Sequence, residues 1–164
     1  MRHFRAIPFL IATVALAAVV AGTAFAATQS KVTFKGTYAG KVTEKVDGSN
    51  VTAVANASGK GTLIGSSKLA GTVTATTANP PCSPILGPGT IAGSKGKLKI
   101  TVTTGSRGCA AGEDDQDNIT VSGTAKVNGG TLKFKKAKGS LHFSGHYDRK
   151  AGSFNVTLTG SFTY

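Results

Sequence analysis

The last eleven residues constrain the fold most, because they alternate strictly between two kinds of side chain. One side of this segment carries Phe154, Val156, Leu158, Gly160, Phe162 and Tyr164, and every position between them is Asn, Ser or Thr. Successive side chains of an extended strand point to opposite faces. The segment therefore predicts a β-strand with one buried face and one face in water.

The same alternation recurs near the start of the chain. Between residues 31 and 46 the apolar face holds Val32, Phe34, Tyr38, Val42 and Val46, opposite a face of Lys and Thr. Residues 51–63 place small side chains, mainly Ala and Gly, on one face, and we expect these to complement the large side chains of the first strand. Shorter strands are predicted over 69–77, 85–92, 98–103, 118–127 and 140–147.

About eight strands with short connections indicate an all-β fold, since no sustained 3.6-residue periodicity follows the first 26 residues. We predict a single antiparallel barrel, whose closure removes exposed strand edges. A two-sheet β-sandwich is the alternative. Residues 105–117 are expected to form a loop, and residues 131–138 either a short strand or a helical turn against the end of the barrel.

The first 26 residues have the pattern of a signal peptide. A basic segment, Met1 to Arg5, precedes an apolar run over 6–22 and the small residues Ala24 and Ala26. We predict cleavage after Ala26, which divides the chain into a signal peptide (1–26) and an all-β barrel domain (27–164). A retained membrane anchor is the alternative. The expected location is extracellular or periplasmic.

Cys82 and Cys109 lie in the exported part, where an even number of cysteines is typical of disulfide bonding. The two positions are equidistant from Lys95 and Gly96, where a two-residue turn would make a hairpin. We therefore predict a Cys82–Cys109 disulfide across the base of that hairpin.

The chain is strongly basic, with 19 Lys and Arg against 7 Asp and Glu and a net charge of +12. Loss of Arg2 and Arg5 with the signal peptide leaves 17 against 7, or +10. Such a protein is attracted to anionic surfaces or polymers in a salt-dependent way. Specific nucleic-acid recognition is not expected, because few aromatic residues share a face with the lysines.

No catalytic, cofactor-binding or metal-binding residue is predicted. His142 and His146 are four apart on a predicted strand, roughly 13 Å, which is too far to share one zinc ion. The acidic residues between Glu113 and Asp117 lack the spacing of a calcium loop and indicate a solvated loop. The segment Gly59 to Thr62 lacks the spacing of a phosphate-binding loop. Four glycosylation sequons, at Asn50, Asn56, Asn118 and Asn155, are interpreted as coincidental.

The closing segment resembles a known kind of barrel. Gly129–Ser140, Gly145–Asp148 and Gly152–Gly160 are similar to the closing portion of small exported bacterial proteins related to the allene-oxide-cyclase and dirigent type of barrel, although Leu132 stands where a glycine is expected. The resemblance covers about a quarter of the chain. It implies a closed antiparallel barrel and transfers no catalytic residue.

Three functions remain open from the sequence. The first is an exported, non-enzymatic barrel that is surface-associated or binds a ligand, with no cofactor. The second is an enzyme of the cyclase or dirigent type, and the third is a small outer-membrane barrel. We favour the first over the third because unpaired lysines would be costly inside a narrow barrel, and because tryptophan is absent and other aromatics are sparse.

Overall fold

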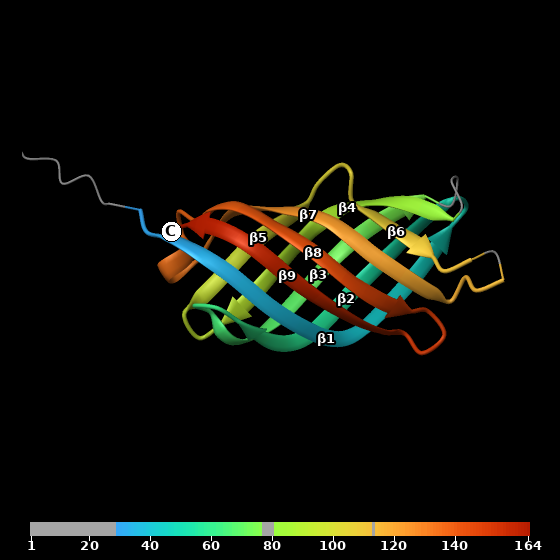
Figure 1. The fold of residues 1–164 in the computed structure, drawn as a ribbon, viewed down its shortest axis with the longest axis horizontal. Helices are drawn as coiled ribbons and strands as arrows, with labels where there is room; N and C mark the ends of the chain where they lie inside the picture. Colours follow the sequence, from blue (N-terminus) through green and yellow to red (C-terminus); the bar gives the residue numbers. More distant parts are fainter. Residues whose placement is uncertain (1–28, 77–80, 113) are drawn as a thin grey trace, which may run out of the picture.

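The computed structural model describes residues 29–76, 81–112 and 114–164, and its strands wrap around one axis (Figure 1). The expected cleavage site at Ala26 lies outside the described residues. The strands are β1 (Lys31–Asp47), β2 (Asn50–Gly61), β3 (Gly65–Thr76), β4 (Cys82–Gly93), β5 (Gly96–Val102), β6 (Arg107–Ala110), β7 (Asn118–Gly130), β8 (Lys138–Asp148) and β9 (Ser153–Thr163). A single 3-10 turn, η1 (Leu132–Phe134), joins β7 to β8.

All strand pairs are antiparallel, and the sheet closes on itself. Each strand pairs with its neighbours in the order β3-β2-β1-β9-β8-β7-β5-β4, and β3 also pairs with β4. The short strand β6 pairs with the same two neighbours as β5, namely β4 and β7. Strands β5 and β6 are thus two pieces of one strand, and the barrel has eight strand positions. The predicted barrel is confirmed, and the sandwich alternative is excluded.

The structure corrects two predictions between residues 93 and 117. Residues 107–110 form β6, so the loop predicted over 105–117 was wrong in part. The turn between β4 and β5 falls on Ser94 and Lys95, because Gly93 pairs with Gly96, and it therefore begins one residue earlier than predicted.

The buried hydroxyl of Ser106 lies in the interruption between β5 and β6. It accepts a hydrogen bond from the backbone N–H of Thr124 at 3.1 Å and donates one to the Thr124 carbonyl oxygen at 3.3 Å.

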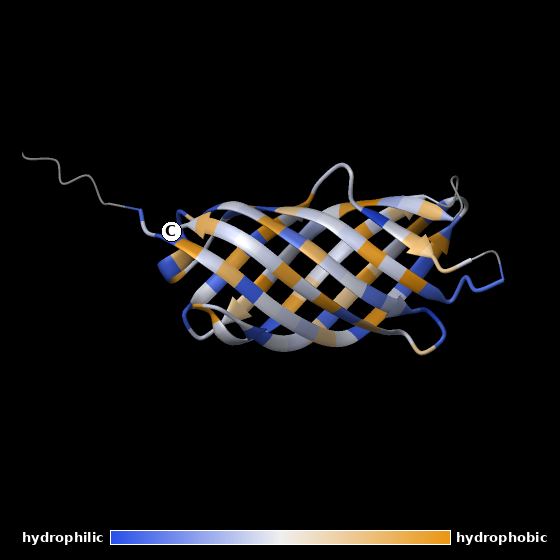
Figure 2. Cartoon of the chain, in the orientation of Figure 1, coloured by the Kyte–Doolittle hydropathy of each residue, from blue (hydrophilic) through white to orange (hydrophobic). Residues whose placement is uncertain are grey.

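The two faces of the sheet divide as the alternation predicted. In Figure 2, hydrophobic and hydrophilic residues alternate along the strands. On β9, Val156, Leu158 and Phe162 are buried inside, while Asn155 and Thr159 are exposed outside. The apolar faces therefore form the interior of the barrel, and the lysine and threonine faces form its outer surface.

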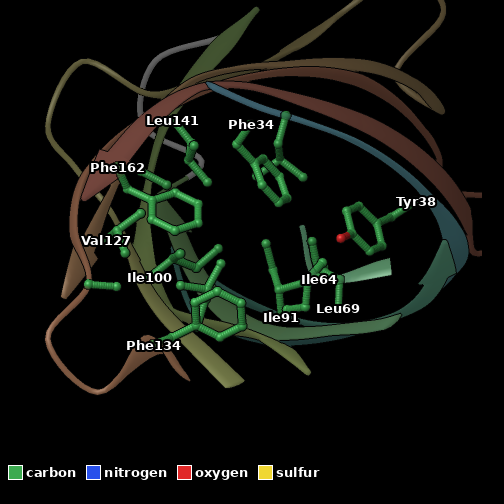
Figure 3. Close-up of a cluster of buried hydrophobic side chains, with 14 of the residues drawn as sticks. Phe34, Tyr38, Ile64, Leu69, Ile91, Ile100, Val127, Phe134, Leu141 and Phe162 are labelled. Atoms are coloured by element: carbon green, nitrogen blue, oxygen red, sulfur yellow. The ribbon is translucent and has the colours of Figure 1, made fainter. Parts of the chain in front are cut away.

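One end of the barrel is filled by side chains, and we call it the plugged end. Here β1, β3, β5 and β8 begin, and the connection over 131–137 folds across the opening. Phe134 and Ala137 of this connection are fully buried, and the Phe134 ring lies 6.0 Å from the Phe162 ring (Figure 3). The prediction of a helical turn against the end of the barrel is confirmed, and the short strand is excluded.

Large and small residues fit together at the plugged end, as the sequence predicted for the first two strands. Phe34 and Tyr38 of β1 are fully buried. A β-carbon added at Gly61 of β2 would lie 2.7 Å from the Phe34 ring, and one at Gly59 would lie 2.8 Å from the Tyr38 ring. Glycine is required at Gly61 because the Phe34 ring occupies the space that a side chain would need. At Gly59 the backbone carbonyl oxygen of Thr37 lies closer still than the Tyr38 ring, so both exclude a side chain there.

The opposite end, which we call the hollow end, is where β1, β3 and β8 finish. It includes the turn after Asp47, residues 111–112 and 114–117 of the β6–β7 connection, and the turn over 149–152. No helix of the described residues is long and apolar enough to cross a bilayer.

Candidate functional site

The interior of the hollow half contains a cavity of about 330 Å³. Its floor is formed by Leu69, Ile100, Ala125 and Leu158, which separate it from the packed plugged half. Its walls are mainly Ala, Val, Gly and Ile residues from all the strands. A cavity with such a lining suits an apolar molecule, because it provides few hydrogen-bonding partners for water.

The cavity exists because the inward side chains become smaller along the same strands. In the plugged half, Tyr38 of β1 lies opposite Gly59 of β2, so a large ring fills the space that the glycine leaves. Toward the hollow end, Val42 lies opposite Ala55, and neither residue reaches far into the barrel. The cavity thus arises from side-chain size on an unbroken backbone.

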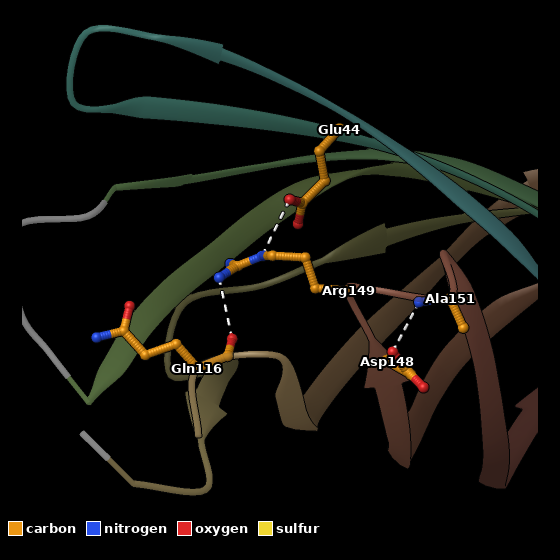
Figure 4. A network of polar contacts seen from close by, with 5 residues as sticks. All are labelled: Glu44, Gln116, Asp148, Arg149 and Ala151. Carbon is orange, nitrogen blue, oxygen red and sulfur yellow. Dashed lines mark hydrogen bonds and ion pairs between the residues drawn. The ribbon is translucent and has the colours of Figure 1, made fainter. Parts of the chain in front are cut away.

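A polar cluster lies where the cavity reaches the hollow end (Figure 4). The Nε of Arg149, in the turn after β8, donates to Oε2 of Glu44 on β1 at 3.1 Å. An Nη of Arg149 donates to the backbone carbonyl of Gln116 at 3.0 Å, and the Arg149 backbone N–H donates to the Asp117 carbonyl at 2.8 Å. Arg149 therefore connects β1, the β6–β7 connection and the β8–β9 turn at the rim of the cavity.

Tyr147 lies beside this cluster and is mostly buried. Burial raises the pKa of its hydroxyl to about 12, and the charge of Glu44 and a hydrogen bond to its carboxylate act in the same direction. The phenol is therefore protonated at neutral pH. The rim presents the Arg149–Glu44 ion pair and one neutral hydroxyl, which is hydrogen-bonded to Glu44.

The disulfide reinforces the same half of the barrel. Cys82 of β4 and Cys109 of β6 are paired directly across the sheet and are bonded to each other, so the predicted disulfide is confirmed. Their neighbours Ser83 and Gly108 line the cavity, so the disulfide lies on the outer face. It holds the short strand β6 against β4.

The two histidines considered as zinc ligands in the sequence analysis lie apart from the cavity. His142 and His146 are exposed on the outer face of β8, and Nδ1 of His142 is 3.2 Å from Oγ1 of Thr124. Within the described ranges, no three His, Cys, Asp or Glu residues are grouped closely enough to hold a metal ion.

The acidic loop before β7 is organised by one of its own carboxylates. Asp115 accepts hydrogen bonds from the side-chain and backbone N–H groups of Asn118, and the side-chain bond is the main cause of the lowered pKa of Asp115. This is the turn chemistry of a solvated loop. Glu113 lies outside the described residues.

Sequence reasoning missed Glu44, Tyr147 and Arg149 as one cluster. Glu44 and Arg149 are 105 residues apart, and their contact depends on barrel closure, which brings β1 beside β9. One signal was present in the sequence: Glu44 is the single charged residue on the apolar face of the first strand. A carboxylate on the inward face of a strand is costly to bury unless a cationic group is paired with it.

Fold and site together define an eight-stranded antiparallel barrel that is plugged at one end and has an apolar cavity in its other half. Comparisons with protein families, with curated proteins and with solved structures gave no match to this chain.

Proposed function

We propose that this protein is exported and binds a small apolar molecule in the cavity of the hollow half without transforming it. The observation that carries the proposal is the cavity itself. Its volume of about 330 Å³ lies at the lower end of the roughly 300–1,000 Å³ range of ligand pockets. Eight-stranded barrels are just wide enough to be filled by side chains or to hold one small ligand.

The outer surface favours a protein that works in water. Four large apolar side chains are exposed in the described part of the chain: Val46, Val54, Leu86 and Leu132. They lie on four different elements, β1, β2, β4 and η1. A lipid-embedded barrel needs a continuous apolar outer band about 25 Å tall with aromatic girdles. The outer-membrane alternative is therefore disfavoured.

An enzyme of the cyclase or dirigent type is the second candidate, and the polar cluster at the rim is the observation in its favour. The chemistry of the cluster weakens it. The carboxylate of Glu44 is engaged by Arg149, and Tyr147, with a pKa of about 12, is a poor base at neutral pH. Ligand binding accounts for the same residues as a rim that fixes the shape of the cavity entrance.

A neutral fluorescent probe tests the proposal. N-phenyl-1-naphthylamine carries no charge, so the basic surface does not attract it, and the protein has no tryptophan to interfere. We expect saturable binding of one probe per protein, with the blue shift and enhanced emission of an apolar environment. Ala55→Phe places a ring in the cavity and should abolish binding.

The matched control is Asn56→Phe, which adds the same ring one residue later, on the outer face of β2. It should leave probe binding unchanged. Equal binding by both variants would place the probe outside the cavity and would contradict the proposed function. If mass spectrometry shows that a natural ligand, once identified, is returned chemically changed, the enzyme alternative is correct.

A further inference from the structure

Charge is distributed unevenly along the barrel axis. Twelve exposed lysines lie in the plugged half, on the strand ends and connections there: Lys31, Lys35, Lys60, Lys68, Lys95, Lys97, Lys99, Lys126, Lys133, Lys135, Lys136 and Lys138. No acidic residue in the described part of the chain lies in this half. The hollow half has five cationic residues against six described acidic ones, at Glu44, Asp47, Asp114, Asp115, Asp117 and Asp148. The basic character of the chain is therefore concentrated at one end.

The most exposed apolar side chain lies at this basic end. Leu132 begins η1, is 76% exposed, and has a φ of 50°, in the left-handed region that non-glycine residues rarely adopt. That conformation costs roughly 1–2 kcal/mol for an L-amino acid. Packing inside the protein does not compensate for it, because the side chain is mostly in solvent.

The connection that carries Leu132 is held firmly. Thr131 and Lys97 exchange two hydrogen bonds, of 2.8 Å between backbones and 3.0 Å to the Thr131 hydroxyl, and Phe134 is buried beneath. The ammonium of Lys133 lies 4.9 Å from the centre of the Tyr164 ring. Leu132 is thus presented outward on a fixed turn, with Lys133, Lys135 and Lys136 around it.

We propose that the plugged end docks on the surface of an anionic phospholipid bilayer, with the lysines against the headgroups and Leu132 inserted among them. Charge complementarity selects an anionic partner, and an exposed leucine among lysines suits a lipid interface, where apolar insertion and attraction to anionic headgroups act together. Docking in this orientation directs the hollow end, with its cavity, away from the bilayer.

Cosedimentation of the purified exported protein with lipid vesicles tests the proposal. We expect binding to vesicles of equal parts phosphatidylcholine and phosphatidylglycerol, weakening at high salt, and no binding to phosphatidylcholine alone. Replacing Lys133, Lys135 and Lys136 by Gln should weaken binding on the order of a hundredfold, from the value of each lysine near an anionic surface. Replacing Lys45, Arg107 and Lys150 by Gln removes the same charge from the hollow half and should have a several-fold smaller effect.

The variant Leu132→Asn distinguishes binding to a lipid surface from binding to other polyanions. Asparagine tolerates the left-handed conformation, so the variant should be at least as stable as the parent while its vesicle binding falls roughly fivefold. Its binding to soluble heparin should be unchanged. Equal losses in the two triple variants would assign binding to net charge alone. Vesicle binding that is insensitive to Leu132→Asn would make this end a general polyanion site, and either result would overturn the proposal.

Discussion

The two halves of this barrel are made from the same strands and differ in what fills them. At the plugged end, Phe34, Tyr38 and Phe162 are almost fully buried and pack against glycines of the facing strands. At the hollow end, alanine and valine face one another and leave a cavity of about 330 Å³. Strand pairing is continuous through both halves. One closed sheet can therefore be stabilised by packed side chains at one end and leave room for a ligand at the other.

The largest contrast in stability is expected between two phenylalanines of β9. Phe162 is 2% exposed in the plugged half, whereas Phe154 is only partly buried and lines the cavity. Truncating a packed aromatic residue costs about 3–5 kcal/mol. We expect Phe162→Ala to lower the free energy of unfolding by that amount in denaturant titrations, and Phe154→Ala by less than half as much. Equal losses would mean that the hollow half is packed as well.

The disulfide should make the next largest contribution. Cys82 and Cys109 are separated by 27 positions in the sequence, and for a loop of that size chain entropy gives about 3–4 kcal/mol. Replacing both with Ala should lower the free energy of unfolding by roughly this amount. Hydrogen exchange of β6 should accelerate more than that of β9, because β6 is short and lies beside the bond. Uniform acceleration in both strands would show that the disulfide acts on the whole barrel.

The sequence predicted the features that depend on local pattern, and it missed those that depend on closure. Alternation placed Phe154, Leu158 and Phe162 inside correctly, and the even number of cysteines in the exported part predicted the disulfide. The spacing argument assumed a turn one residue too late, and the interruption between β5 and β6 restores the pairing of Cys82 with Cys109. Strand β6 was missed because four residues at the edge of a glycine-rich segment carry too little periodicity. The Glu44–Arg149 contact was missed because only a closed barrel brings the two residues together.

Substitutions at two glycines test the difference in packing between the two halves, with a smaller expected change in stability. A β-carbon at Gly61, in the plugged half, would lie 2.7 Å from the Phe34 ring, whereas one at Gly108, beside the cavity, would have its nearest neighbour at 3.4 Å. Overpacking costs about 1–3 kcal/mol. Gly61→Ala should lower the melting temperature accordingly, and Gly108→Ala should leave it unchanged or raise it slightly. The reverse order would mean that the interior packing described for the two halves is wrong.

The smallest effect concerns the rim of the cavity. Glu44→Gln removes a negative charge beside Tyr147 and should lower the tyrosine pKa from about 12 toward 10.0, with burial keeping it above that value. Because the folded-state pKa is raised, the stability that Tyr147 contributes is present below pH 10 and is lost as the pH rises toward 12. Absorbance titration, with Tyr147→Phe to identify the signal, measures the shift. An unchanged pKa would show that Glu44 does not influence the ionisation of Tyr147.

Methyl NMR during titration with the neutral probe tests the central claim most directly. If the hollow half takes up an apolar ligand, the methyl signals of Val42, Val73 and Leu69 should shift with saturation, while those of Ile64, Ile91 and Leu98 in the plugged half should not. Shifts confined to the outer residues Val54 and Leu86, or spread evenly over both halves, would contradict a cavity that is specific to the hollow end.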